Sequence, residues 1–119
     1  MKCHGKKGGG TSPLASIFNA QMCFQNMITG MRRPIDDYKL FQYHVTGMME
    51  ELGEVLKADK RWKSHRNTKY DPTNKLEEIA DVFITAINIA LYSGFSDIDV
   101  FEMIMFKIAL NENKLRLED

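Results

Sequence analysis

The chain has few cysteines, and their positions match no metal-binding motif. Cys3 and Cys23 are the only two, and they lie twenty residues apart. A small secreted domain held together by disulfides would need a denser set, so the sequence favours reduced thiols in a cytoplasmic protein. Cys3 and His4 together offer too few ligands for a metal site in the glycine-rich start of the chain.

Neither sign of charge predominates. Sixteen basic residues balance sixteen acidic ones, which gives no argument for a nucleic acid or an anionic membrane as the main partner. No uninterrupted apolar run reaches the length of a membrane-spanning helix. The basic start lacks the apolar segment of a secretory signal. We therefore expect a cytoplasmic protein that binds neither nucleic acid nor membrane.

The length of the chain allows one domain with a hydrophobic core but not two. At 119 residues it lies within the ordinary size range of a single domain. Four glycines and three lysines crowd the start, which predicts a flexible leader at residues 1–11. The remaining residues, 12–119, are expected to form one folded unit.

Helical periodicity dominates after the leader, and no alternating strand pattern persists. Capping signals delimit four expected helices. They run from Ser12 to Gly30, from about Asp37 to Lys63, from Asp71 to before Gly94, and from Ser96 to about Leu117. This order predicts an all-α fold, a unit resembling a four-helix bundle.

The third expected helix carries a single polar stripe. At about 100° per residue, its polar side chains fall within about 100° of one another. They are Asn74, Glu77, Glu78, Asp81, Thr85, Asn88 and Tyr92. The rest of this helix is apolar, which predicts burial on most sides. The stripe must therefore face either solvent or an enclosed polar site, and this helix alone leaves both interpretations open.

The second expected helix offers acids beside its apolar face. Glu51 and Glu54 share a narrow strip with His44 and with two small residues, Gly47 and Ala58, which would leave room for a ligand. Glu50 lies further around the helix from this strip and is expected to point toward solvent.

Two helices that each present an acid pair can bring four carboxylates together. Like charges at such short distances raise each other's pKa, so a cation is needed to keep them ionised. Oxygen ligands favour Mg²⁺, with Mn²⁺ as an alternative. No Glu-x-x-His pair is present in these helices, which argues against a di-iron centre.

The fourth expected helix supplies cations. Lys107, Asn111 and Lys114 lie along one stripe of an otherwise apolar helix. Lysines and an amide beside a bound metal would suit the outer oxygens of a polyphosphate. An ordinary solvated face explains the two lysines taken alone.

These motifs, in this order, resemble a known family. Glu50-Glu51-Leu-Gly-Glu54 followed by Glu78-Ile-Ala-Asp81 is similar to the E-E-x-x-E … E-x-x-D signature of the all-α nucleoside triphosphate pyrophosphohydrolases. This superfamily includes MazG proteins, dimeric dUTPases and dCTP pyrophosphatases. The segment "KIALNENK", from Lys107 to Lys114, resembles the family's K-x-x-x-N-x-x-[KR] tail.

The resemblance implies a function and a set of roles. It implies hydrolysis of the α–β phosphate linkage of a (d)NTP to a nucleoside monophosphate and pyrophosphate, with a pyrimidine dNTP such as dUTP or dCTP favoured. The implied metal ligands are Glu51, Glu54, Glu78 and Asp81. Glu50 or Glu77 would be the candidate base, although an exposed surface position explains either residue. Substrate contacts would come from Lys107, Asn111, Lys114, Trp62 and Lys63.

The resemblance also implies an assembly, because a single short unit would have to complete its pocket from a neighbouring chain. We therefore expect a homodimer or homotetramer. Phe18 and Gln21 of the first expected helix are further candidate base contacts. His44 and Asn88 would border the site, although a satisfied position at the edge of the core better explains either residue. Trp62 is explained as well by a helix-end anchor that packs on the bundle. Two alternatives remain open: a helical dimeric interaction module whose acids are merely solvated, and a nucleotide-binding protein without catalytic activity.

Overall fold

The computed structural model describes residues 12–61 and 69–118. Within these ranges the chain forms α1 (Pro13–Thr29), α2 (Tyr38–Asp59), α3 (Pro72–Leu91) and α4 (Asp97–Glu118). No strand occurs in these two ranges. Asp36 and Ser93 form an isolated antiparallel β-bridge. The predicted all-α fold with four helices is confirmed. The leader at 1–11, Trp62 and Lys63 lie outside the described residues.

Local capping explains where all four helices begin. At the start of α2 the Asp37 carboxylate accepts a hydrogen bond from the Leu40 amide at 3.1 Å. The Ser12 side chain accepts a hydrogen bond from the Ala15 amide at 3.1 Å, and the Asp71 carboxylate accepts one from the Thr73 amide at 3.0 Å. Ser96 and Asp99 exchange amide-to-side-chain hydrogen bonds of 2.9 and 3.2 Å, which form a capping box at the start of α4. Each of these starts agrees with the sequence prediction.

The end of α2 differs from the prediction. The helix stops at Asp59 instead of continuing toward Lys63, and Lys60 adopts the left-handed conformation with a φ of 64°. The Asp59 carboxylate accepts hydrogen bonds from the Arg61 guanidinium at 2.7 Å and from the Lys75 ammonium of α3 at 2.7 Å. These bonds hold the pKa of Asp59 far below its usual range. They tie the end of α2 to the start of α3.

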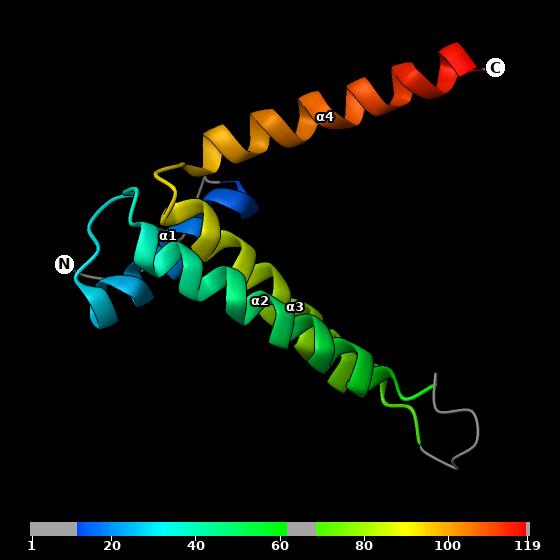
Figure 1. Ribbon diagram of the computed structural model, residues 1–119, viewed down its shortest axis with the longest axis horizontal. Helices are drawn as coiled ribbons and strands as arrows, with labels where there is room; N and C mark the ends of the chain where they lie inside the picture. Colours follow the sequence, from blue (N-terminus) through cyan, green and yellow to red (C-terminus); the bar gives the residue numbers. More distant parts are fainter. Residues whose placement is uncertain (1–11, 62–68, 119) are drawn as a thin grey trace.

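The helices α2 and α3 form a long antiparallel hairpin. The helix α1 packs against α3 at the end of the hairpin remote from Asp59 and Pro72 (Figure 1). The buried core lies at this packed end. It consists of Phe18, Met31, Ile87, Leu91 and Tyr92. Backbone bonds of 2.9 Å from the Ile35 amide to the Leu91 carbonyl and from the Asp37 amide to the Tyr92 carbonyl fasten the α1–α2 connection to the end of α3.

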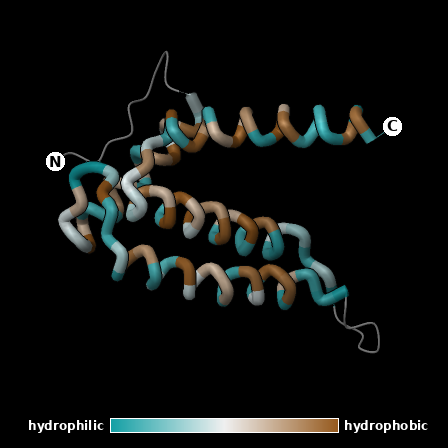
Figure 2. The backbone as a smooth tube through the Cα atoms, turned by 45° about the horizontal axis from the view of Figure 1, so that its top comes forward, coloured by the Kyte–Doolittle hydropathy of each residue, from teal (hydrophilic) through white to brown (hydrophobic). Residues whose placement is uncertain are grey.

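The last helix, α4, is an arm. It contacts α1 near its start and then projects away from the hairpin (Figure 1). None of its residues is buried, although hydrophobic segments recur along its length (Figure 2). A single chain therefore does not close its four helices into a bundle. No helix in the described part of the chain is long and apolar enough to cross a membrane.

Candidate functional site

Three carboxylates meet on the middle of the hairpin. Glu51 of α2 and Glu78 and Asp81 of α3 each place one carboxylate oxygen within 4.8 Å of the others. Glu78 and Asp81 are three residues apart and therefore share one helix face. The antiparallel pairing of α2 with α3 brings Glu51 opposite them. We call these three residues the acid cluster.

Space lies beside the acid cluster on α2. Apart from its chain neighbours and the backbone of its own helix, no atom lies within 4 Å of a Cβ built on Gly47, one turn before Glu51. The space beside this glycine is therefore open. Ala58 behaves differently, because it is buried at 4% exposure in the packing of the hairpin and leaves no room for a ligand.

The electrostatics of the acid cluster are unfavourable without a cation. Desolvation raises the pKa of Glu78, and the neighbouring carboxylates of Asp81, Glu54, Glu51 and Glu77 raise it further. In the part of the chain that the structure describes, no basic side chain forms an ion pair with Glu51, Glu78 or Asp81. The charges of the cluster are left to repel one another.

Glu54 lies at the border of the acid cluster. It is close enough to raise the pKa of Glu78, but its carboxylate pairs with Lys57 at 3.6 Å on the exposed side of α2. An exposed pair of this kind contributes little to stability. Glu54 therefore lies beside the acid cluster without belonging to the group of three whose oxygens come within 4.8 Å of one another.

The two candidate bases are not part of the acid cluster. Glu50 and Glu77 are both exposed. Glu77 contributes to the raised pKa of Glu78, which places it near the acid cluster. Glu50 is not among the carboxylates that act on Glu78, in keeping with the expectation that it points toward solvent.

The second half of the α3 stripe is enclosed and fully hydrogen-bonded. Asn88 accepts a hydrogen bond from the Gln21 amide of α1 at 2.8 Å. The Tyr92 hydroxyl donates to the Gln25 side-chain oxygen at 2.6 Å and lies 2.8 Å from the Thr29 hydroxyl. Thr85, Asn88 and Tyr92 are all buried. A solvent-facing stripe is therefore wrong for this half.

A cavity of about 670 Å³ opens beside this enclosed half, between α1, α2 and α3. Its wall includes Gln21, His44 and Asn88. His44 precedes Glu51 by seven residues and Asn88 follows Asp81 by seven, so the cavity lies two helical turns, about 10 Å, along the hairpin from the acid cluster. Gln21, a candidate base contact, thus lines this cavity together with His44 and Asn88. The hydrogen bond that Asn88 accepts from Gln21 also fits the expected position at the edge of the core.

Other wall residues were missed, and one candidate contact is wrong. Phe18 is 3% exposed in the core and is absent from the cavity wall, because α1 turns it toward Leu91 and Tyr92. The residues that sequence analysis did not name are Phe24, Gln25, Ile28, Thr29, Leu40, Tyr43 and Ile84. Helical spacing could have indicated only the wall residues of α1, such as Gln25 and Ile28, which share a face with Gln21.

His44 forms a neutral aromatic part of the cavity wall. Its ring stacks on that of Tyr92 with centroids 5.3 Å apart and planes 9° apart, and it meets Tyr43 edge-on at 5.1 Å. Burial lowers the pKa of His44 below its ordinary value. The uncharged imidazole is therefore the dominant form at neutral pH.

The predicted phosphate contacts of α4 are not brought to the acid cluster by a single chain. Lys107, Asn111 and Lys114 are exposed on the arm, which diverges from the hairpin (Figure 1). Trp62 and Lys63 lie outside the described residues. The structure thus brings together Glu51, Glu78 and Asp81, with Glu54 beside them.

No protein-family model, curated protein or solved structure matches this chain. The resemblance to the pyrophosphohydrolases consequently rests on the sequence motifs, and the geometry of the acid cluster is an independent observation.

Proposed function

We propose that this protein is a Mg²⁺-dependent nucleoside triphosphate pyrophosphohydrolase of MazG-like type. The reaction would be hydrolysis of the α–β linkage of a (d)NTP, with a pyrimidine dNTP such as dUTP or dCTP favoured, in cytoplasmic nucleotide-pool house-cleaning. The observation that carries the proposal is the acid cluster: three carboxylate oxygens within 4.8 Å of one another, from two helices, with no basic partner among the described residues.

The donor set suits a hard divalent cation. Glu51, Glu78 and Asp81, with Glu54 in reach, offer only carboxylate oxygens, which are the ligands that Mg²⁺ and Mn²⁺ prefer. A cation held there would neutralise phosphate charge and lower the pKa of a bound water. The protein's own part is to hold these side chains on two rigid helices, at an open surface where a triphosphate has access.

A carboxylate at the rim would position the attacking water. Glu77 is the better placed candidate for this role, because it is exposed and acts electrostatically on Glu78. A water held by such a carboxylate loses its proton to it as the bond to phosphorus forms. Glu50 is the alternative base, further from the cluster.

The cavity between α1, α2 and α3 would take the nucleoside. Its volume of about 670 Å³ lies in the usual range for small-molecule sites, and aromatic and amide side chains line it. A distance of about 10 Å from the acid cluster suits a substrate whose base and phosphates are bound separately. Phe24 and Tyr43 offer ring surfaces against which a base can pack.

The first test is pyrophosphate release from a panel of NTPs and dNTPs, with Mg²⁺ and with EDTA. We expect release with Mg²⁺ that stops with EDTA and in Glu51→Ala. Glu112→Gln on the exposed part of α4 is the matched control and keeps its activity. Release that persists in Glu51→Ala would overturn the assignment of the site.

The uncovered apolar surface of α4 favours a second candidate function, a helical dimeric interaction module. This candidate predicts no stabilisation by Mg²⁺ with a non-hydrolysable dUTP analogue. A nucleotide-binding protein without catalytic activity predicts stabilisation without pyrophosphate release. Thermal melting and the release assay together distinguish all three functions. A homodimer or homotetramer is part of the enzyme proposal.

A further inference from the structure

Gly47 lies on α2 between the cavity wall and the acid cluster. It follows the wall residue His44 by three positions and precedes Glu51 by four. At about 100° per residue, these three positions fall within about 60° of one another, so they follow one side of the helix. Because the space beside Gly47 is open, a ligand that extends from the cavity to the acid cluster can pass close to the backbone of α2 at this point.

Thr85 occupies the matching position on α3. It follows Asp81 by four residues and precedes the wall residue Asn88 by three, and these positions also fall within about 60° of one another. Thr85 is buried, and its hydroxyl donates a hydrogen bond to the Asp81 carbonyl at 2.9 Å. The hydroxyl proton is therefore already engaged, and this stretch of the hairpin offers a ligand room and apolar contact.

A glycine inside a helix destabilises it, because glycine is among the least favourable residues at such a position. The helix α2 contains two, Gly47 and Gly53. Gly53 is exposed and lies about 160° around the helix from Glu51. Gly47 is half-buried and lies on the side of Glu51. Close approach of a ligand to the backbone is a reason to keep a glycine at position 47, and it does not apply to position 53.

A nucleotide carries its pentose between its base and its α-phosphate. A substrate with its base in the cavity and its phosphates at the acid cluster therefore places its pentose over Gly47 and Thr85. We propose that these two residues form a pentose subsite and that Gly47 determines which substrates fit it, because the missing side chain leaves room for the sugar ring. This inference rests on the proposed function, which supplies the identity of the substrate.

The spacing along the hairpin suits a single pentose. Gly47 lies about 4.5 Å along the helix axis from His44 and about 6 Å from Glu51. A side chain at position 47 would project into the middle of this interval, where the sugar ring has to lie. It would touch neither the base in the cavity nor the cation at the acid cluster, so its effect should be confined to the pentose.

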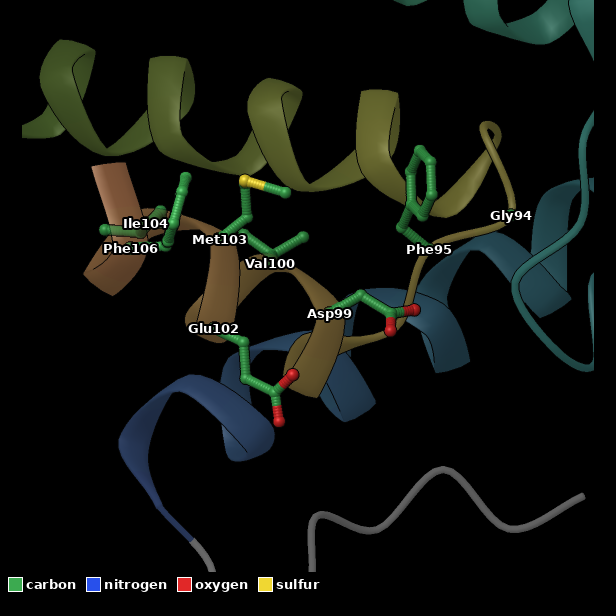
Figure 3. A pocket seen from close by; sticks show the side chains of 8 residues that line it. All are labelled: Gly94, Phe95, Asp99, Val100, Glu102, Met103, Ile104 and Phe106. Carbon is green, nitrogen blue, oxygen red and sulfur yellow. The ribbon is translucent and has the colours of Figure 1, made fainter. Parts of the chain in front are cut away.

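The hollow at the start of α4 does not offer such an arrangement. It has a volume of about 750 Å³ and is formed by the α3–α4 turn and the first turns of α4. Figure 3 shows Phe95 and Met103 on the side of the hollow where α3 runs, whereas Glu102 points the opposite way. Because α4 diverges from the hairpin, a substrate held at the acid cluster uses the cavity between α1, α2 and α3 instead.

The test begins with a matched pair of substitutions on α2. Gly47→Ala and Gly53→Ala each replace a glycine inside the same helix, so each should raise the melting temperature by about 2–5 °C. Only Gly47→Ala places a methyl group in the pentose subsite. The kcat/KM for pyrophosphate release should therefore fall about 10-fold in Gly47→Ala and stay unchanged in Gly53→Ala. Gly47→Leu should lower kcat/KM by about 100-fold.

Binding of three ligands then locates the effect within the site. Inorganic triphosphate with Mg²⁺ reaches only the acid cluster, so isothermal titration should give the same affinity for Gly47→Leu and wild type. A non-hydrolysable dUTP analogue with Mg²⁺ should bind Gly47→Leu at least about 10-fold more weakly. An acyclic analogue, in which an open chain replaces the sugar ring, should lose less affinity, because the flexible chain can pass beside the new side chain.

The outcomes separate the possible failures. Active wild-type chains with an unchanged kcat/KM in Gly47→Leu would overturn the pentose subsite and leave the enzyme function standing. Inactive wild-type chains in which Gly47→Leu weakens binding of the dUTP analogue alone would overturn the enzyme function and support the subsite. Equal weakening of triphosphate binding would place the effect at the acid cluster and would overturn the subsite. Wild-type chains that bind neither the dUTP analogue nor triphosphate would overturn both proposals.

Discussion

The polar stripe of α3 has two halves that differ in one respect. Asn88 and Tyr92, near the packed end, each find a partner on α1 and are 5% and 1% exposed. Glu78 and Asp81, two turns away, meet only other carboxylates in the described part of the chain. The same helix face thus carries one satisfied polar network and one group of like charges.

The difference indicates what each half does. A satisfied buried network fixes how helices pack, because breaking it leaves polar atoms without water or a partner. A group of like charges weakens the fold, and under the proposed function a bound cation would relieve that repulsion. We therefore expect changes in the two halves to have opposite signatures in stability and activity.

The largest expected effect is on activity at the acid cluster. Asp81→Asn removes one negative ligand and one source of repulsion, so pyrophosphate release should fall by about 100-fold or more. The melting temperature without metal should stay the same or rise. A steady-state assay and calorimetry measure the two quantities. A fall in both would show that Asp81 has a structural role like that of Tyr92.

The next largest effect would come from a charge placed in the enclosed half. Asn88→Asp introduces a carboxyl at a buried position, which should lower the free energy of unfolding by about 2–4 kcal/mol at neutral pH. The loss should shrink as pH falls from neutral and should be gone below about pH 4, where the carboxyl is protonated in both the folded and the unfolded state. Asn113→Asp on exposed α4 is the matched control and should change little in urea unfolding. Equal losses of unfolding free energy in Asn88→Asp and Asn113→Asp would contradict the difference between the enclosed half of the stripe and an exposed position.

A smaller effect is expected from a single hydroxyl. Tyr92→Phe deprives the buried Gln25 side chain of its 2.6 Å partner and should lower the free energy of unfolding by about 1–3 kcal/mol. Tyr43→Phe removes a hydroxyl from a residue that is 70% exposed and should leave stability unchanged. A Tyr92→Phe chain as stable as wild type would mean that water replaces the lost partner.

The smallest expected effect is the pH dependence of Glu78. Its pKa is raised in the folded chain, so the folded state holds the proton more tightly than the unfolded state. The stabilising contribution of the protonated form is fully present below the ordinary carboxyl pKa and is lost as pH rises through the raised value. In EDTA, Glu78→Gln should therefore melt higher than wild type at neutral pH and alike at about pH 3. Added Mg²⁺ should reverse the order at neutral pH.

Local features of the fold were predictable from the sequence. The caps at Ser12, Asp71 and Ser96 depend on residues within three positions, so each helix start could be read directly. The acids share a face because helical spacing alone determines it. The end of α2 could not be predicted, because the contact of Asp59 with Lys75 spans sixteen residues.

Tertiary features of the site were harder to predict from the sequence. Periodicity places Phe18 on the apolar face of α1 but does not tell whether it lines a cavity or fills the core. It likewise predicts the helix α4 but not its direction, so a unit resembling a four-helix bundle was expected where the single chain leaves α4 as an arm. Relations between helices depend on packing that no local pattern encodes.

The direction of that arm depends on the backbone at Gly94. This glycine has a φ of +84°, and a Cβ there would lie 3.5 Å from the Asp36 amide nitrogen. Any other L-residue would raise the conformational energy by about 1–2 kcal/mol and would favour a different exit for the helix that follows. The exit angle also decides how much of the apolar surface of α4 a single chain can cover with its own hairpin. One backbone torsion thus accounts for an arm on which no residue is buried.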